Sequence, residues 1–449
     1  MPSAYAETLK QKLDVLMDKS LPYASVGVSV KDLQSGKDIY KRNDTKLLSP
    51  ASGIKLFTAA ASLYKLGPNY QYETSILKHD SSIYVRFSGD PSLKTNELQG
   101  LIKQLKDQGI SRIEGNIVLD SSKYQPPNYA AGINYDDLGW YYVAPSSAIV
   151  LNENKETFEF ISATKLGQPV KIKSQHANPP VKLINQLISV SKEQKENHCN
   201  FNIDIKPNNT LKLYGCLSQY KDTRRLSLAI TNPAIYAQEV VKQALTAQQI
   251  NLKGKIIVGT TPSSAKLIAQ HQSKPLISLV KHMLMESDNL YADSLTKLLG
   301  FSLTRQGTYK QGAYAIKQII SKHTNLNVDN LDISDGQGTR YNLISPSQMV
   351  VLLNTLYTDK SMWKLISTAL PVMGESGSLA WRMKESALKS RVIGKTGTMH
   401  DISSLSGYLT TQNGKQLAFS IIINGMHKDI GKAKRLEENM LNVLYQHAP

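Results

Sequence analysis

A helix with a serine and a lysine on one face is predicted by residues 49–61, which read Ser-Pro-Ala-Ser-Gly-Ile-Lys-Leu-Phe-Thr-Ala-Ala-Ala. Ser52 and Lys55 are three residues apart, which places both side chains on the same side of a helix that ends near Leu66. A helix N-terminus favours negative charge that develops beside the serine oxygen. A lysine one turn further can activate that serine if burial or a nearby cation keeps its amine partly neutral. The small residues that follow indicate a helix packed inside a domain and therefore a rigidly held serine.

The Ser-x-x-Lys spacing also occurs at Ser62/Lys65 and at several other places, so this pair alone has little weight. Two further motifs increase that weight. They are Ser287-Asp288-Asn289, which follows an apolar helical run, and Lys395-Thr396-Gly397-Thr398, which ends a strand predicted over residues 390–394.

In this chain order the three motifs resemble the signature of class A β-lactamases and penicillin-binding proteins, which transfer acyl groups through a serine. The resemblance implies that Ser52 attacks a carbonyl with Lys55 as its base. Backbone N–H groups of Ser52 and Thr398 would then form the oxyanion hole. Ser287 would pass a proton to the leaving nitrogen, and Asn289 would hold the amide of the substrate.

The Lys-Thr-Gly strand is expected to bind the substrate. Lys395 and Gly397 share one face of this strand because side chains alternate with a period of two. Lys395 offers positive charge to a substrate carboxylate and helps to return the proton, whereas Gly397 leaves room for the substrate backbone. Thr396 is counted with them as a residue that contacts the substrate.

Residues 56–286 separate the first two motifs and are far too long for the helical subdomain of a compact β-lactamase. Alternating valines over residues 26–30, and a hairpin over 405–423 with Asn413-Gly414 at its turn, predict an antiparallel sheet made from both ends of the chain. We therefore expect a multidomain α+β fold with a β-lactamase-like catalytic domain of helices around this sheet. Its expected parts are a catalytic domain (1–73 and 275–449), a mainly β inserted domain (74–152 and 225–274) and a nested insertion (153–224).

Nearly the whole chain resembles the class C, type-4 low-molecular-mass penicillin-binding proteins, a family of D-alanyl-D-alanine carboxypeptidases and endopeptidases. Beyond the three motifs, the resemblance rests on five segments: 88–93 (Ser-Gly-Asp-Pro-Ser-Leu), 140–149, 335–338 (Asp-Gly-Gln-Gly), 340–343 (Arg-Tyr-Asn-Leu) and 404–408 (Ser-Leu-Ser-Gly-Tyr). The family usually has glycine in place of Ser88 and serine in place of Gln337. Both departures lie outside the catalytic motifs and affect local substrate contacts. The resemblance implies cleavage of peptidoglycan stem peptides, acylation of Ser52 by β-lactams, and endopeptidase activity in the same cleft.

The same resemblance places Asp137, Tyr142, Arg340 and Met399 around a pocket for the side chain of the third residue of the peptide. In part of the family this residue is a diamino acid with both an amine and a carboxylate, which an aspartate and an arginine suit by charge. The alternative is an ordinary surface pair beside a buried methionine. Asp136 also competes with Asp137 for the role.

Composition argues against several other classes of protein. None of the nine histidines lies in a triad motif, no Gly-x-Ser-x-Gly elbow stands out, and no His/Cys spacing suits a metal, so neither a metal nor an organic cofactor is expected. The net charge of +17 comes from scattered lysines without a nucleic-acid-binding motif. Such a basic surface is compatible with an anionic cell-wall polymer or with membrane headgroups.

The expected location is the periplasm. No apolar run approaches the roughly 18 residues of a membrane span, and no secretory signal precedes the first helix, which leaves a cytosolic protein or a mature exported chain whose signal has been removed. The family resemblance favours the exported chain, since the substrate lies outside the inner membrane. The two cysteines, Cys199 and Cys216, lie in one segment with strand-like runs around Pro207-Asn208-Asn209. A hairpin there would allow a disulfide in an oxidising compartment. The alternative is two inert thiols.

Two other functions fit the motifs. A β-lactamase shares the chemistry but would turn over penicillin rapidly, and the long insertion argues against it. A catalytically silent scaffold that binds the cell wall is the second, because motifs can outlive activity. The intact set of three motifs argues against the silent scaffold.

Overall fold

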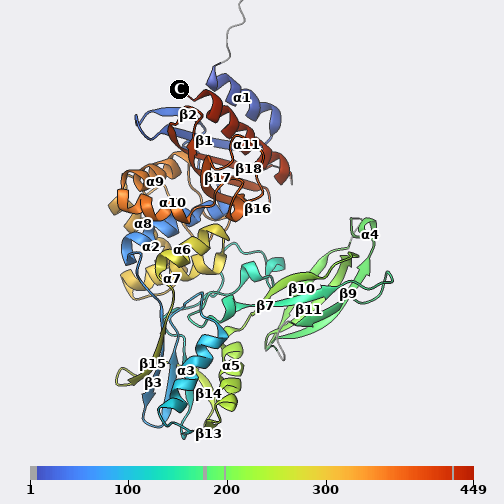
Figure 1. Ribbon diagram of the computed structural model, residues 1–449, viewed down its shortest axis with the longest axis vertical. Coiled ribbons are helices and arrows are strands. Elements are labelled where there is room, and N and C mark those ends of the chain that lie inside the picture. The colour runs from blue at the N-terminus through green and yellow to red at the C-terminus, as the bar shows by residue number, and fades with distance from the viewer. Residues whose placement is uncertain (1–7, 175–178, 180, 197–198, 427–428, 449) are drawn as a thin grey trace, which may run out of the picture.

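The computed structural model describes residues 8–174, 179, 181–196, 199–426 and 429–448. The molecule is elongated (Figure 1). One end is a sheet with two helices beside it, the middle is a cluster of helices, and the other end is a second sheet from whose side a β-rich arm projects. Within the described residues, no helix is both long and apolar enough to cross a membrane.

The first sheet joins the two ends of the chain. Its five antiparallel strands have the order β16-β17-β18-β1-β2. The turn before β18 contains Gly414 at φ +82°, a conformation that glycine adopts without strain. Helices α1 and α11 cover one face with apolar side chains that form a core with the strands. The bounds are β1 Ser25–Asp32, β2 Asp38–Arg42, β16 Val392–Met399, β17 Ile402–Thr410, β18 Gln416–Asn424, α1 Leu9–Ser20 and α11 Ile430–His447.

The helical cluster surrounds α2 (Lys55–Leu66), in which every residue from 55 to 63 is buried. Small side chains in this helix, among them Ala59 and Ala60, allow its neighbours to approach closely. Helix α9 also faces the first sheet, where the Tyr408 hydroxyl donates to the Leu353 carbonyl at 2.8 Å. The other helices are α6 Leu276–Met285, α7 Asn289–Thr304, α8 Tyr309–His323, α9 Pro346–Thr358 and α10 Lys360–Ala369.

The second sheet has five strands in the order β14-β6-β4-β3-β15, with α3 (Thr95–Asp107) and α5 (Pro233–Ala247) beside it (Figure 1). Pairs β4–β6 and β14–β6 are parallel, whereas β3 pairs antiparallel with β4 and β15. The bounds are β3 Glu73–His79, β4 Ser82–Arg86, β6 Ile117–Asp120, β14 Ile256–Gly259 and β15 Lys266–Gln272, with β5 Arg112–Ile113 paired separately to β13 Asn251–Leu252.

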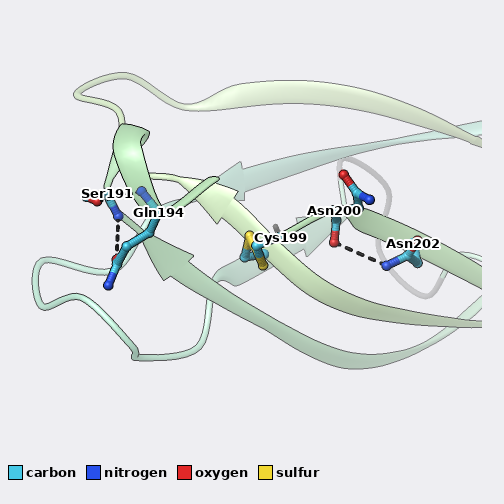
Figure 2. The surroundings of a disulfide bond; sticks show 6 residues. Ser191, Gln194, Cys199, Asn200 and Asn202 are labelled. Atoms are coloured by element: carbon cyan, nitrogen blue, oxygen red, sulfur yellow. Dashed lines mark hydrogen bonds between the residues drawn. A yellow bond between two sulfur atoms is a disulfide. The ribbon is translucent and has the colours of Figure 1, made fainter. Parts of the chain in front are cut away.

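The arm consists of two three-stranded sheets, β12-β7-β8 and β10-β11-β9. A disulfide joins Cys199 to Cys216 with a Cα–Cα distance of 5.7 Å, so the two cysteines are not free thiols. Figure 2 shows the bridge at Cys199, which lies just before β10, and its partner Cys216 belongs to β11. The bounds are β7 Lys155–Ile161, β8 Lys171–Ser174, β9 Lys182–Val190, α4 Lys192–Glu196, β10 Phe201–Lys206, β11 Thr210–Ser218 and β12 Arg224–Ala229. The expected multidomain α+β fold class is confirmed by these sheets and helices.

Candidate active site

Ser52 lies in a tight 3-10 turn, η1 (Ala51–Ile54), and the α-helix begins only at Lys55. The predicted single helix is therefore preceded by a turn. Ala51 has φ +45°, a left-handed conformation that costs an alanine free energy and persists only where packing enforces it. Gly338 supplies part of this packing, because a Cβ atom there would lie 2.1 Å from the Ala51 carbonyl oxygen.

Lys55 is completely buried beneath Ser52. Its Nζ donates to Ser52 Oγ at 2.9 Å, to Asn289 Oδ1 at 2.7 Å and to the Gln337 carbonyl at 2.6 Å. Burial lowers the pKa of Lys55 to about 8, against the weaker opposing effect of nearby carboxyl groups. These groups belong to Asp293, Asp288 and Asp335. The amine is therefore partly neutral near neutral pH, as a general base must be.

The Ser-Asp-Asn motif is shaped by the start of α7. Asp288 caps this helix, because its side chain accepts from the Tyr291 N–H at 3.2 Å. The cap places Asn289 in the first turn, where its Nδ2 donates to the Tyr142 carbonyl at 2.8 Å while its oxygen holds Lys55. Ser287, just before the cap, has φ +57°.

Lys395 reaches the same region from β16. Its buried Nζ donates to Ser287 Oγ at 2.8 Å and to the Thr396 carbonyl at 2.7 Å. Burial and, secondarily, the Lys55 ammonium lower the pKa of Lys395 well below its usual range. A substrate carboxylate would reverse this effect and favour the charged form.

The Lys-Thr-Gly motif lies within β16, which continues to Met399, and not at its end as expected. The space beside Gly397 is filled by the protein, because a Cβ atom there would lie 2.2 Å from the Pro50 carbonyl oxygen. Gly397 thus lets the sheet approach the turn that carries Ser52. From the sequence, the lack of a side chain there was expected to leave room for the substrate backbone. Thr396 donates its hydroxyl to Ser378 Oγ at 2.7 Å and does not line the cleft.

A cleft of about 390 Å³ opens in front of Ser52, Asn289 and Thr398. One wall comes from the loop between β6 and β7, which contains the short helices η2 (Tyr135–Asp137) and η3 (Tyr141–Val143). All four residues that the sequence placed around a specificity pocket line this cleft: Asp137, Tyr142, Arg340 and Met399. His400 lines it as well.

Asp137 and Arg340 are connected through Asn134. Asp137 accepts from the Tyr142 hydroxyl and from Asn134 Nδ2, both at 2.9 Å, and Asn134 Oδ1 accepts from Arg340 Nη2 at 3.0 Å. Asp136 is exposed and does not line the cleft. Sequence reasoning missed Asn134, whose only signal was its position three residues before Asp137.

Glu153, His282 and Asp288 form the one group of His, Asp and Glu side chains in the described residues that could hold a metal ion, with ligand atoms within 4.8 Å of one another. Lys94 contacts the Glu153 carboxylate at 2.6 Å, and Lys155 contacts its other oxygen. A divalent cation would meet both ammonium groups, so this cluster is a poor metal site. It lies outside the residues predicted from sequence, apart from Asp288.

The fold and the convergence of the three motifs define a penicillin-recognising serine acyl-transferase. A sequence profile described as the D-Ala-D-Ala carboxypeptidase 3 (S13) family matches residues 9–445, and the chain belongs to that family. Membership confirms the prediction of a serine-type D-alanyl-D-alanine carboxypeptidase.

The chain is similar to a D-alanyl-D-alanine carboxypeptidase, DacB, from Haemophilus influenzae, with 31% identity over 96% of this chain and 93% of the relative. The crystal structure of penicillin binding protein 4 (dacB) from Haemophilus influenzae matches with a TM-score of 0.89 and 29% identity, covering 97% of this chain and 99% of that one. A second structure, that protein complexed with a novel β-lactam, matches with a TM-score of 0.82 and 28% identity over the same shares.

Proposed function

We propose that this chain removes the terminal D-alanine from peptidoglycan stem peptides through an acyl-enzyme on Ser52. The observation that carries the proposal is the 2.9 Å contact between Ser52 Oγ and the buried Lys55 amine, whose pKa is lowered to about 8. A protonated serine hydroxyl is a weak nucleophile near neutral pH, and a partly neutral amine at this distance supplies the base that activates it.

In the first step Ser52 transfers its proton to Lys55, and its Oγ forms a bond to the D-alanyl carbonyl carbon. The resulting oxyanion is stabilised by the N–H groups of Ser52 and Thr398. The C–N bond then breaks, and the proton that Lys55 accepted is passed on to the departing D-alanine nitrogen through Ser287 and Lys395, which lie 2.8 Å apart. Water then attacks the ester carbonyl and gives a proton to the neutral Lys55 amine, which returns it to Ser52 Oγ as the C–O bond of the ester breaks. Asn289 binds the amide of the substrate throughout.

The cleft wall supports a specificity for the third residue of the stem peptide. Asp137 would pair with an amine and Arg340 with a carboxylate of a diamino acid, while Tyr142 and Met399 contact its carbon chain. Cleavage of D-alanyl cross-links between peptides is the second activity that this open cleft would allow.

We further propose a periplasmic location, which the disulfide supports because such bonds persist in oxidising compartments. The net charge of +17 would favour contact with the anionic cell wall or with membrane headgroups. The division into a catalytic domain (1–73, 275–449), an inserted domain (74–152, 225–274) and a nested domain (153–224) is likewise proposed.

The direct test is the intact mass of the protein after brief exposure to benzylpenicillin, beside a Ser52→Ala variant. A stable one-to-one adduct on the parent chain and none on Ser52→Ala is expected, because the leaving group of a β-lactam stays tethered and hinders deacylation. Consumption of penicillin without an adduct would instead identify a β-lactamase. Intact penicillin and unchanged mass would favour a silent scaffold.

A further inference from the structure

Lys297 is a buried cation that the reaction does not use. It lies on α7, two turns after Asn289, and its side chain is fully inaccessible to solvent. Its Nζ donates to three main-chain carbonyls: Gln125 at 3.2 Å, Pro127 at 2.8 Å and Ser146 at 2.8 Å. An ammonium group has three N–H donors, so each donor here has an acceptor. The Tyr309 ring, 4.7 Å from Nζ, adds a cation–π contact.

The three carbonyls lie at the two ends of one loop. Gln125 and Pro127 precede it and Ser146 ends it, and the Ser146 N–H donates to the Asn128 carbonyl at 2.8 Å across its base. We call residues 128–146 the cleft loop. It contributes six residues to the cleft: Gly132, Ile133, Asn134, Asp137, Tyr142 and Val143.

The remaining polar contacts of the cleft loop with the site lie nearer the solvent. Arg340 reaches Asn134, and Asn289 reaches the Tyr142 carbonyl, and both contacts are exposed. Water competes with such bonds, whereas it does not reach the Lys297 ammonium. The buried anchor is therefore the one that fixes both ends of the loop to the helix that carries Asn289.

We infer that Lys297 is a positioning residue that holds the cleft loop in the shape needed to bind the third residue of the substrate. This inference rests on the proposed function. Two turns of α7 would then have different roles. Asn289 in the first turn binds the Lys55 amine, and Lys297 in the third turn fixes the cleft loop that selects the substrate. Lys297 touches neither the substrate nor Ser52.

The test compares two acylated peptides that end in D-alanyl-D-alanine. The third residue from the start of the stem is a diamino acid with a free amine and carboxylate in one peptide and glycine in the other. Lys297→Met fills a similar volume but donates no hydrogen bond. We expect the KM of this variant for the diamino peptide to rise at least tenfold, while its kcat for that peptide changes less than threefold. For the glycine peptide, both KM and kcat should change less than threefold.

Lys123→Met is the matched control. Lys123 precedes the cleft loop, and its ammonium also lies over aromatic rings, 5.9 Å from Tyr72 and 5.6 Å from Phe301. We expect both peptides to be cleaved as by the parent chain. Amide hydrogen exchange should become faster across residues 128–146 in Lys297→Met and stay unchanged in Lys123→Met.

Equal losses on both peptides, or no loss on either, would overturn the inference. Should Lys297→Met not fold, Lys297→Gln keeps two N–H donors and undergoes the same comparison; failure of both to fold would assign Lys297 to folding and also overturn it. A parent chain that does not distinguish the two peptides would instead refute the proposed pocket. A missing penicillin adduct would refute the proposed chemistry.

Discussion

Gln337 joins the buried carboxyl of Asp293 to the reactive amine. Its side-chain Nε2 donates to Asp293 Oδ2 at 2.8 Å, and its main-chain carbonyl accepts from Lys55 Nζ at 2.6 Å. Burial, with the nearby Asp335 second, raises the pKa of Asp293 well above its usual range. A raised pKa weakens the opposing effect that the Asp293 carboxyl has on the Lys55 amine. Gln337, one of the two positions at which the chain departs from the family pattern, thus has a structural role.

Replacing this glutamine should weaken the protein and slow the reaction. Gln337→Ala leaves Asp293 Oδ2 with only the Tyr309 hydroxyl, which donates at 2.8 Å. Losing one of the two hydrogen bonds to this buried oxygen costs about 0.5–1.5 kcal/mol of the free energy of unfolding. Denaturant unfolding would measure this loss, and the rate of penicillin acylation should fall with it. Gln412→Ala, at an exposed position, is the control. Equal stability of the two variants would contradict the expectation.

Acylation should depend on pH through Lys55. Because burial lowers its pKa to about 8, the neutral amine that accepts the Ser52 proton becomes the major form as the pH rises above that value. The second-order rate constant for penicillin acylation should therefore increase about tenfold between pH 7 and pH 9. Stopped-flow measurement at constant ionic strength checks this. A flat or falling profile would exclude Lys55 as the base, and Lys55→Arg, always charged, should stay inactive at every pH.

Gly397 should tolerate no side chain. A Cβ atom there would lie 2.2 Å from the Pro50 carbonyl, so Gly397→Ala must push β16 away from the turn that carries Ser52. A displacement of this kind misplaces the Thr398 N–H, and losing one oxyanion donor costs about 10²–10³ in rate. Gly100→Ala, in α3 with no atom within 4 Å of the added carbon, is the matched control. An acylation rate within threefold of the parent chain would refute the close approach.

The chemistry was predictable because acyl transfer requires particular residue types in a fixed chain order. Ser52, Lys55 and Asn289 meet within hydrogen-bonding distance, as that order implied. The same reasoning did not find the turn before α2, because it depends on the left-handed Ala51 and its contact with Gly338, which is distant in sequence.

Contacts with main-chain partners could not be predicted from the sequence. Lys297 donates to main-chain carbonyls such as that of Ser146, and the main-chain carbonyl of Gln337 accepts from Lys55. Every residue has a main-chain carbonyl, so the residue type gives no signal for such a contact. Only tertiary packing decides which carbonyls meet a given side chain. The role of Gly397 was misassigned for the same reason, since its neighbour Pro50 belongs to a different element.

The charges of the cleft wall should decide which stem peptides are cleaved. Arg340→Gln removes the cation that would pair with the carboxylate of a diamino acid, so KM for that peptide should rise about tenfold, the equivalent of one charge-assisted hydrogen bond. A peptide with lysine at the third position has the amine but no carboxylate, and its KM should change little. Asp137→Asn should instead raise KM for both peptides, because both bear the amine. Steady-state release of D-alanine measures the four KM values, one for each variant with each peptide. If Arg340→Gln affects the two peptides equally, Arg340 only supports the loop through Asn134, to which it donates at 3.0 Å.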